Sequence, residues 1–149
     1  MKTLITIMTA LLLGAFPAAA EQWQCQPTPQ DAQGPFYREG APVRNEVGKG
    51  YLLMGEVKSA ADCEPIAGAK IELWTTGPDG RYDDRWRATV FANEDGRYYF
   101  RTAFPGRYGS RPPHIHILVN ARGYQELVTQ HYPKPATGEA IFDLVLKPE

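Results

Sequence analysis

From residue 51 onward, short runs rich in β-branched and aromatic residues alternate with clusters of Gly, Pro and Asp. Runs of this kind predict β-strands, and we expect them over 51–57, 70–75, 87–92, 97–102, 114–119, 126–132 and 140–146. Asp79-Gly80 and Asp95-Gly96 are typical of tight turns. No stretch after residue 20 keeps a helical apolar pattern for three turns. The pattern therefore predicts an all-β sandwich or barrel.

The segment before these runs differs in composition. Residues 21–45 are rich in Pro, Gln and Gly and show no sustained period, which predicts an extended arm lying over the domain. No internal repeat or low-complexity tract divides the rest of the chain. We expect one β-sandwich domain over residues 21–149, with an extended N-terminal arm.

The first twenty residues have the features of a signal peptide. Met1-Lys2 supplies a positive start, 4–16 is apolar, and Ala18-Ala19-Ala20 offers a cleavage site. The apolar run is shorter than the roughly 18 residues that a bilayer span needs. We expect 1–20 to be removed on export, leaving a periplasmic or extracellular protein without a membrane span. An uncleaved N-terminal anchor is the alternative.

Charge narrows the classes of partner. Without Lys2, the mature part keeps 15 of the 16 basic residues against 17 acidic ones, a net charge of −2. This balance provides no basic surface for nucleic acid and no membrane-binding face. It does not indicate a substrate.

The chain has two cysteines, Cys25 and Cys63. In an oxidising compartment, such a pair predicts a disulfide that ties the arm to the domain. Two free, buried thiols are the alternative.

The densest chemical signal is the segment Arg111-Pro112-Pro113-His114-Ile115-His116. On a strand, residues i and i+2 point to the same face, so His114 and His116 present two imidazoles together while Ile115 faces the core. A metal ion between the two rings would satisfy both of them. An exposed pair on a strand face is the alternative for this pattern alone. The third histidine, His131, is expected to face away from its neighbour Gln130 as a surface or packing residue.

Two tyrosines stand in matching contexts upstream of the histidines. Tyr82 follows Gly80-Arg81 and Tyr108 follows Gly106-Arg107, each at a turn from which a side chain can point into a cleft. A tyrosine at a turn more often packs against a sheet edge, so composition alone does not make either residue a ligand.

Taken together, these motifs resemble those of the intradiol ring-cleavage dioxygenases, the family of the protocatechuate and catechol dioxygenases. The shared motifs occur in the same order along most of the mature chain. They are Gly34-Pro35-Phe36-Tyr37, 63–69, Ile71-Glu72-Leu73-Trp74, Gly80-Arg81-Tyr82, 96–102, Pro105-Gly106-Arg107-Tyr108, 111–116 and Thr129-Gln130.

The resemblance implies one Fe(III) per chain, held by Tyr82, Tyr108, His114 and His116 with a hydroxide or water in the fifth position. Phenolate oxygens favour the ferric state, and zinc usually takes Cys, His and carboxylate ligands instead. The implied substrates are O₂ and a small aromatic diol, which would displace the hydroxide and Tyr108. The ring would open to a cis,cis-muconate. The resemblance also allows a homo-oligomer.

Three further roles follow from the same resemblance. Arg111 would lie over the substrate ring and stabilise developing negative charge, a task that suits a rigid, permanently charged guanidinium. Gln130 would hydrogen-bond near Arg111, and Tyr37 would line the mouth of the substrate site. From the sequence alone, a surface ion pair is the alternative for Arg111, and a strand glutamine that faces water is the alternative for Gln130.

Two other functions remain compatible with parts of the pattern. A secreted, transthyretin-like β-sandwich could bind a partner without catalysis, because the strand motifs occur in such modules too. A zinc or copper site with a hydrolytic or binding role would keep the histidines and change the metal. Neither alternative accounts for the tyrosines and the histidine pair together.

Overall fold

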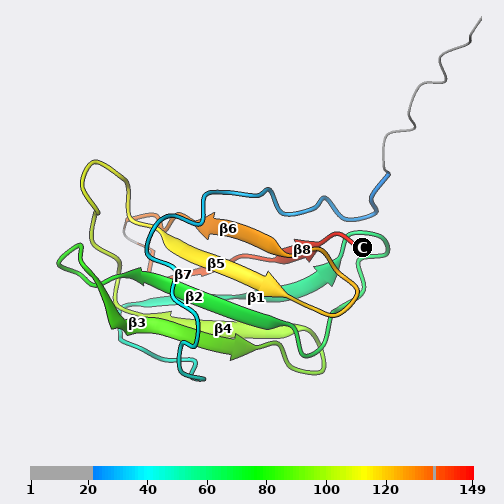
Figure 1. Ribbon diagram of the computed structural model, residues 1–149, viewed down its shortest axis with the longest axis horizontal. Helices are drawn as coiled ribbons and strands as arrows, with labels where there is room; N and C mark the ends of the chain where they lie inside the picture. Colours follow the sequence, from blue (N-terminus) through cyan, green and yellow to red (C-terminus); the bar gives the residue numbers. More distant parts are fainter. Residues whose placement is uncertain (1–21, 136) are drawn as a thin grey trace, which may run out of the picture.

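Two four-stranded sheets face each other in a computed structural model that describes residues 22–135 and 137–149 (Figure 1). The predicted signal peptide lies outside these residues. The strands are β1 (Tyr51–Ser59), β2 (Lys70–Thr76), β3 (Tyr82–Phe91), β4 (Arg97–Thr102), β5 (Ile115–Asn120), β6 (Leu127–His131), β7 (Glu139–Ile141) and β8 (Leu144–Leu146). The described residues form no helix, and so none that could cross a membrane. The all-β sandwich predicted from the sequence is confirmed.

The first sheet has the order β4-β1-β7, and β8 pairs with the far end of β1. β7 and β8 both run parallel to β1, one after the other. The single strand expected over 140–146 is therefore wrong. The strand is interrupted at Phe142-Asp143. The Phe142 carbonyl lies so close to Gly55 that a Cβ on Gly55 would be 2.2 Å from the carbonyl oxygen. The Asp143 carboxylate then accepts the N–H of Glu56 at 3.0 Å.

The second sheet is antiparallel throughout, in the order β3-β2-β5-β6. β3 begins at Tyr82, five residues earlier than the sequence predicted. Its start contains the polar run Asp83-Asp84-Arg85, which hides the alternation of apolar and polar residues. A register shift between Trp74 and Thr76 brings Thr76 opposite Tyr82. This irregular pairing places a tyrosine at the end of the sheet.

The core lies between the two sheets and follows from strand alternation. Ile115, Ile117 and Val119 of β5 point inward and are fully buried, facing Leu53 and Phe100 of the first sheet. The residues between them on β5 therefore point to the outer face of the second sheet.

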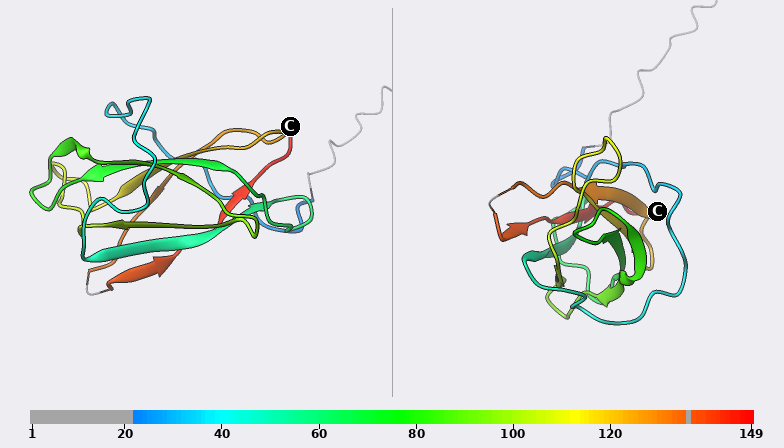
Figure 2. Two further views of the ribbon diagram at one scale, coloured as in Figure 1. Left: turned by 90° about the horizontal axis from the view of Figure 1, so that it is seen from below. Right: turned by 90° about the vertical axis from the view of Figure 1, so that its left-hand side faces the viewer.

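The N-terminal arm covers this outer face. It runs along β6 and then crosses β5, β2 and β3, as Figures 1 and 2 show in blue to cyan. Backbone hydrogen bonds join Asp31 to Val128 on β6 at 2.9 Å, and Thr89 on β3 to Pro42 at 2.8 Å. The expected extended arm is thus present, and the space beneath it is where the predicted site residues gather.

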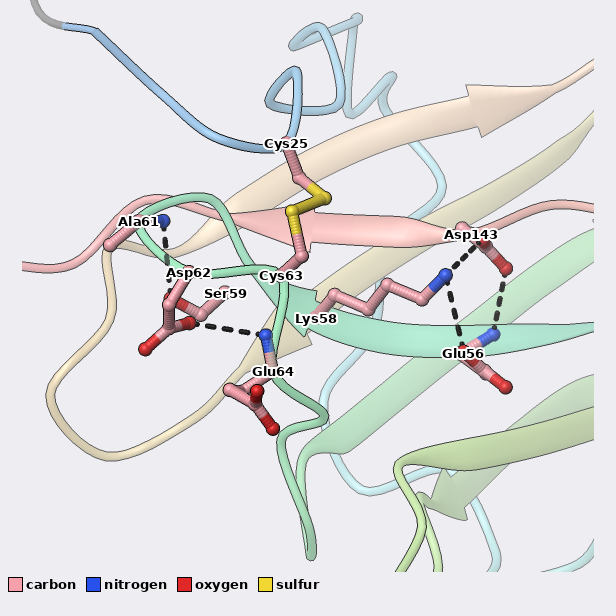
Figure 3. The surroundings of a disulfide bond; sticks show 9 residues. All are labelled: Cys25, Glu56, Lys58, Ser59, Ala61, Asp62, Cys63, Glu64 and Asp143. Carbon is pink, nitrogen blue, oxygen red and sulfur yellow. Dashed lines mark hydrogen bonds and ion pairs between the residues drawn. A yellow bond between two sulfur atoms is a disulfide. The ribbon is translucent and has the colours of Figure 1, made fainter.

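A disulfide ties the start of the arm to the β1–β2 loop (Figure 3). Cys25 and Cys63 are bonded with their Cα atoms 5.4 Å apart, and the Cys25 N–H donates to the Ala60 carbonyl at 3.1 Å. The two cysteines are therefore not free thiols. The disulfide anchors the arm at the end of the sandwich opposite the histidine pair.

Candidate metal and substrate site

The two histidines lie side by side where β5 begins. Pro112 and Pro113 precede β5, and His114 and His116 then point to the outer face, while Ile115 points into the core. Their Nε2 atoms are 3.1 Å apart, and the residues are 2 % and 1 % exposed. The exposed-pair alternative is therefore excluded.

Tyr82 completes a triangle of donor atoms with these rings. Its hydroxyl oxygen lies 2.9 Å from Nε2 of His114 and 3.0 Å from Nε2 of His116. Two ligands at right angles, each about 2.1 Å from one ion, would lie about 3.0 Å apart. The three atoms thus have the spacing of neighbouring ligands around a single cation.

Hydrogen bonding orients one of the imidazoles as a ligand. Nδ1 of His114 lies 2.8 Å from the Pro112 carbonyl, which can only accept, so Nδ1 carries the proton and Nε2 presents its lone pair to the triangle. Among the described residues, Nδ1 of His116 is buried without a hydrogen-bond partner.

Burial keeps all three groups neutral in the absence of a metal. It lowers the pKa of His116 to about 4, assisted by the charges of His114 and Arg111. It also lowers the pKa of His114 and raises the pKa of Tyr82 to about 12. Neutral imidazoles are the ligating form, and a buried phenol ionises only beside a strong Lewis acid.

In the described part of the chain, no three His, Cys, Asp or Glu side chains lie close enough together to hold a metal ion. A cation bound by the two histidines would therefore need the tyrosine oxygen as a further ligand.

Tyr108 lies beside the triangle but does not join it. Its ring contacts the rings of Tyr82 and Phe36 edge-on, with centroids 5.4 and 5.1 Å away, and the residue is 42 % exposed. No hydrogen bond links its hydroxyl to the two histidines in the described structure. Of the four expected ligands, the structure brings together three and leaves Tyr108 at their solvent-facing side.

The two Gly-Arg-Tyr turns pack directly against each other. The Gly106 N–H donates to the Gly77 carbonyl at 2.9 Å, and the Thr76 hydroxyl donates to the Gly106 carbonyl at 2.8 Å. Gly80 has a φ of +75° and lies so close to Arg107 that a Cβ would be 2.2 Å from its carbonyl oxygen. This contact, which needs glycine, brings both tyrosines to the same end of the sandwich.

Arg111 and Gln130 are in direct contact, as the resemblance implied. The Arg111 guanidinium donates from Nη2 to Oε1 of Gln130 at 2.8 Å and to the Tyr132 hydroxyl at 3.2 Å. Gln130 is only 5 % exposed. The alternation of β6 places Gln130 on the site face opposite His116, so the glutamine does not face water. Sequence reasoning missed Tyr132, two residues further along, although i and i+2 share a face.

Two aromatic side chains support the triangle and were not predicted as site residues. Phe36 of the arm stacks on Tyr82, with centroids 4.3 Å apart. Trp74 of β2, which is opposite His116 in the sheet, stacks on that imidazole at 4.9 Å with the ring planes 1° apart. Gly34 lets the arm pass over the same imidazole, since a Cβ there would be 3.1 Å from Cε1.

Tyr37 lies behind this aromatic layer. Its ring contacts Trp74 at 5.2 Å, and its hydroxyl donates to the buried Glu72 carboxylate at 3.3 Å. Burial, together with the nearby Glu72 charge, raises the pKa of Tyr37. The structure does not bring Tyr37 into contact with the triangle or with Arg111.

His131 faces away from Gln130, into the space between the sheets. It is half-buried, its Nε2 lies 2.7 Å from the Tyr51 hydroxyl, and its ring packs against Phe142. The expected packing role is confirmed.

A cavity of about 160 Å³ opens beside Tyr82. Its walls include Phe36, Tyr82, Asp83, Asp84 and Arg87, and they include neither of the two histidines nor Arg111. A larger hollow of about 380 Å³, between the start of the arm and β8, lies away from the triangle.

The chain is similar in sequence to several known 1,2-dioxygenases. The chain is 33 % identical to a 6-chlorohydroxyquinol 1,2-dioxygenase of Cupriavidus pinatubonensis, over 64 % of this chain and 47 % of the relative. It is 34 % identical to a chlorocatechol 1,2-dioxygenase of a Pseudomonas species, over 67 % and 53 %. The chain is a homologue of intradiol ring-cleavage dioxygenases. It spans about half the length of these curated relatives, and no protein-family model matches it.

A solved structure extends the likeness to the family's fold. The dioxygenase domain of a dioxygenase–carbohydrate-binding protein fusion from a cellulolytic Streptomyces matches with a TM-score of 0.76 and 28 % identity. The match covers 83 % of this chain and 100 % of that domain. The intradiol family that the motifs indicated is thus supported both by sequence and by fold.

Proposed function

We propose that this chain is a non-heme Fe(III) intradiol dioxygenase that opens the ring of a catechol-type aromatic with O₂. The observation that carries the proposal is the convergence of Tyr82, His114 and His116 to within 2.9–3.1 Å of one another. A binding module has no need for two buried imidazoles and a half-buried phenol whose donor atoms lie so close together. The homologues named above act on chlorocatechol and chlorohydroxyquinol, which indicates a diol on an aromatic ring as the substrate class.

The donor set fits a ferric ion. Tyr82, His114 and His116 would hold one ion per chain, with Tyr108 as the fourth ligand at the solvent side. When bound, such an ion would supply Lewis-acid chemistry that makes the ring of a catechol reactive towards O₂. The choice of iron over zinc or copper rests on the phenol oxygens, because a phenolate is a hard anionic donor.

The tyrosines have different tasks in this proposal. Tyr82 is half-buried under Phe36 and would hold the ion as a phenolate. Tyr108 is exposed, so its phenol oxygen would be free to accept a proton from an incoming catechol hydroxyl and pass it to water. The exposure of the second tyrosine therefore supports its role as a base.

Arg111 acts on the ring of the substrate. Burial is the main cause of the lowered pKa of His114 and His116, and the Arg111 charge is close enough to both rings to lower the pKa further. A guanidinium held by Gln130 stabilises negative charge that develops on the ring as O₂ attacks. The bond between the two hydroxyl-bearing carbons breaks, and both atoms of O₂ enter the product. The expected product is a cis,cis-muconate. Because both atoms of O₂ enter this product, the reaction needs no external reductant.

We also propose that the protein works outside the cytoplasm, in the periplasm or beyond the cell. The leader-like pattern of residues 1–20 and the Cys25–Cys63 disulfide support this location, because disulfides persist in oxidising compartments.

The visible absorption spectrum of the purified protein, with metal analysis on the same sample, tests the proposal. Tyrosinate bound to Fe(III) absorbs in the visible, so a red-brown protein with about one iron per chain is expected, and a variant with both Tyr82→Phe and Tyr108→Phe should be colourless. Turnover is then measured with catechol, chlorocatechol and hydroxyquinol. A protein that stays colourless and iron-free after reconstitution with iron would overturn the proposal.

A further inference from the structure

Among the described residues, the Arg111 guanidinium has two hydrogen-bond acceptors, and neither of them is charged. They are Oε1 of Gln130 at 2.8 Å and the Tyr132 hydroxyl at 3.2 Å. Both groups contain a donor as well as an acceptor, so each could present the wrong atom to a guanidinium, which only donates. Something must therefore set the orientation of the amide and of the hydroxyl.

A carbonyl of the arm orients the amide. Nε2 of Gln130 donates to the Ala32 carbonyl, which turns Oε1 towards Arg111. The reverse orientation of the amide would place two oxygens together at Ala32 and two donors together at Arg111. The arm backbone thus selects the orientation in which Gln130 can accept.

The preceding arm residue orients the hydroxyl in the same way. The Tyr132 hydroxyl lies 2.8 Å from Oδ2 of Asp31 and 3.1 Å from Oε1 of Gln130. A hydroxyl has one proton, and a carboxylate is a stronger acceptor than an amide oxygen. The proton therefore goes to Asp31, and an oxygen lone pair is left for Arg111.

From these contacts we infer that the arm segment Asp31-Ala32 positions Arg111, with Asp31 acting through Tyr132 and Ala32 through Gln130. Asp31 and Tyr132 are positioning residues, and Arg111 is the group that would touch the substrate. This inference rests on the proposed function for its catalytic consequence but not for its geometry.

The arm segment is itself firmly held. The Asp31 N–H donates to the Val128 carbonyl on β6 at 2.9 Å, and its Oδ1 accepts the Ala32 N–H at 2.6 Å. Burial opposes ionisation of Asp31, but the Ala32 N–H, the Tyr132 hydroxyl and the Arg111 charge outweigh it and lower the pKa of Asp31. The carboxylate is therefore ionised at neutral pH and lies one hydroxyl away from the guanidinium. Neutral amide and hydroxyl partners leave more of the Arg111 charge for the substrate than a direct ion pair would.

The geometry is tested in the metal-free protein by ¹⁵N NMR of the arginine side chains, with Arg111→Lys identifying the Arg111 signals. An ordered guanidinium gives resolved, slowly rotating Nη–H signals in the wild type. Asp31→Asn and Tyr132→Phe should each broaden these signals, while the Gln130 contact keeps part of the order. Glu39→Gln is the matched control, because Glu39 is an exposed carboxylate of the same arm and takes part in no ion pair among the described residues. Unchanged Arg111 signals in both test variants would overturn the inference.

The catalytic consequence is tested in the iron-loaded protein with catechol. Asp31→Asn and Tyr132→Phe should each lower kcat about 10-fold, with KM within 2-fold and the thermal midpoint unchanged. The double variant should be no slower than Tyr132→Phe alone, and Asp31→Asn should have no effect in an Arg111→Lys background. Additive losses would contradict action through Tyr132. If the wild type turns over no catechol, the proposed function fails, and the NMR result alone decides whether the arm positions Arg111.

Discussion

Tyr82 and Tyr108 follow the same Gly-Arg step, yet they differ in surroundings. Tyr82 begins β3, is stacked under Phe36 and contacts both histidines. Tyr108 lies in the loop before β5, touches Tyr82 edge-on and is 42 % exposed. The difference arises from the sheet, since Tyr82 is paired with Thr76 while Tyr108 has no strand partner. Identical local sequence therefore does not determine which tyrosine is a fixed ligand and which can move.

The largest expected effect comes from removing one phenol or the other. Tyr82→Phe should lower iron affinity by well over 100-fold, because it removes a ligand rather than a supporting contact, which is typically worth 10–100-fold. Tyr108→Phe should lose only about 10-fold in affinity while most of the turnover disappears. Iron content, visible absorbance and kcat measured on both variants check this. Equal loss of iron in the two would show that Tyr108 is as firm a ligand as Tyr82.

The contact between the two turns can be broken at Gly80. Gly80→Ala adds a methyl group against the Arg107 carbonyl at a positive φ, and should lower the free energy of unfolding by about 3 kcal/mol. Gly109→Ala is the matched control, because its φ of +58° is also left-handed but no atom lies within 4 Å of the added Cβ. It should cost about 1 kcal/mol.

Urea unfolding of the metal-free variants gives both values. A Gly80→Ala cost no larger than that of Gly109→Ala would mean that the two turns move apart freely. The iron affinity of Gly80→Ala should fall as well, since the variant displaces the loop that holds Tyr108.

Phe36 touches both tyrosines and so connects the two regions. Phe36→Leu removes a stacked pair and an edge-on pair and should destabilise the protein by about 1 kcal/mol. The visible band of the iron protein should shift as Tyr82 gains freedom. A band and a stability identical to those of the wild type would show that the arm only covers the site.

The smallest expected effect is a dependence of stability on alkaline pH in the metal-free protein. Burial raises the pKa of Tyr82 to about 12, above the value near 10 of an unfolded tyrosine. Between these values the unfolded chain loses this proton more readily, so the stability contributed by neutral Tyr82 is present below pH 10 and falls as pH rises towards 12. Urea unfolding at pH 9 and pH 11 should show a smaller fall for Tyr82→Phe than for the wild type. The same fall in both proteins would contradict the raised pKa.

Strand alternation explains what could be read from the chain alone. Because side chains on a strand alternate with a period of two, Pro112-Pro113-His114-Ile115-His116 was enough to place both imidazoles on one face and Ile115 in the core. The Gly-Pro-rich composition of residues 21–45 likewise predicted an arm. The all-β class, the arm and the histidine pair therefore follow from local sequence.

Other features depend on pairings that no local pattern contains. Three features required the register of the sheets: the early start of β3, the split of the last strands at Phe142, and the contact between Tyr132 and Arg111. The sequence by itself determined which donors exist and that two of them share a face. Only the tertiary structure decided that Tyr82 meets them, that Tyr108 stays outside, and that Asp31 reaches Arg111 through Tyr132. Those contacts join segments tens of residues apart, so they form only when the sheets and the arm close around one core.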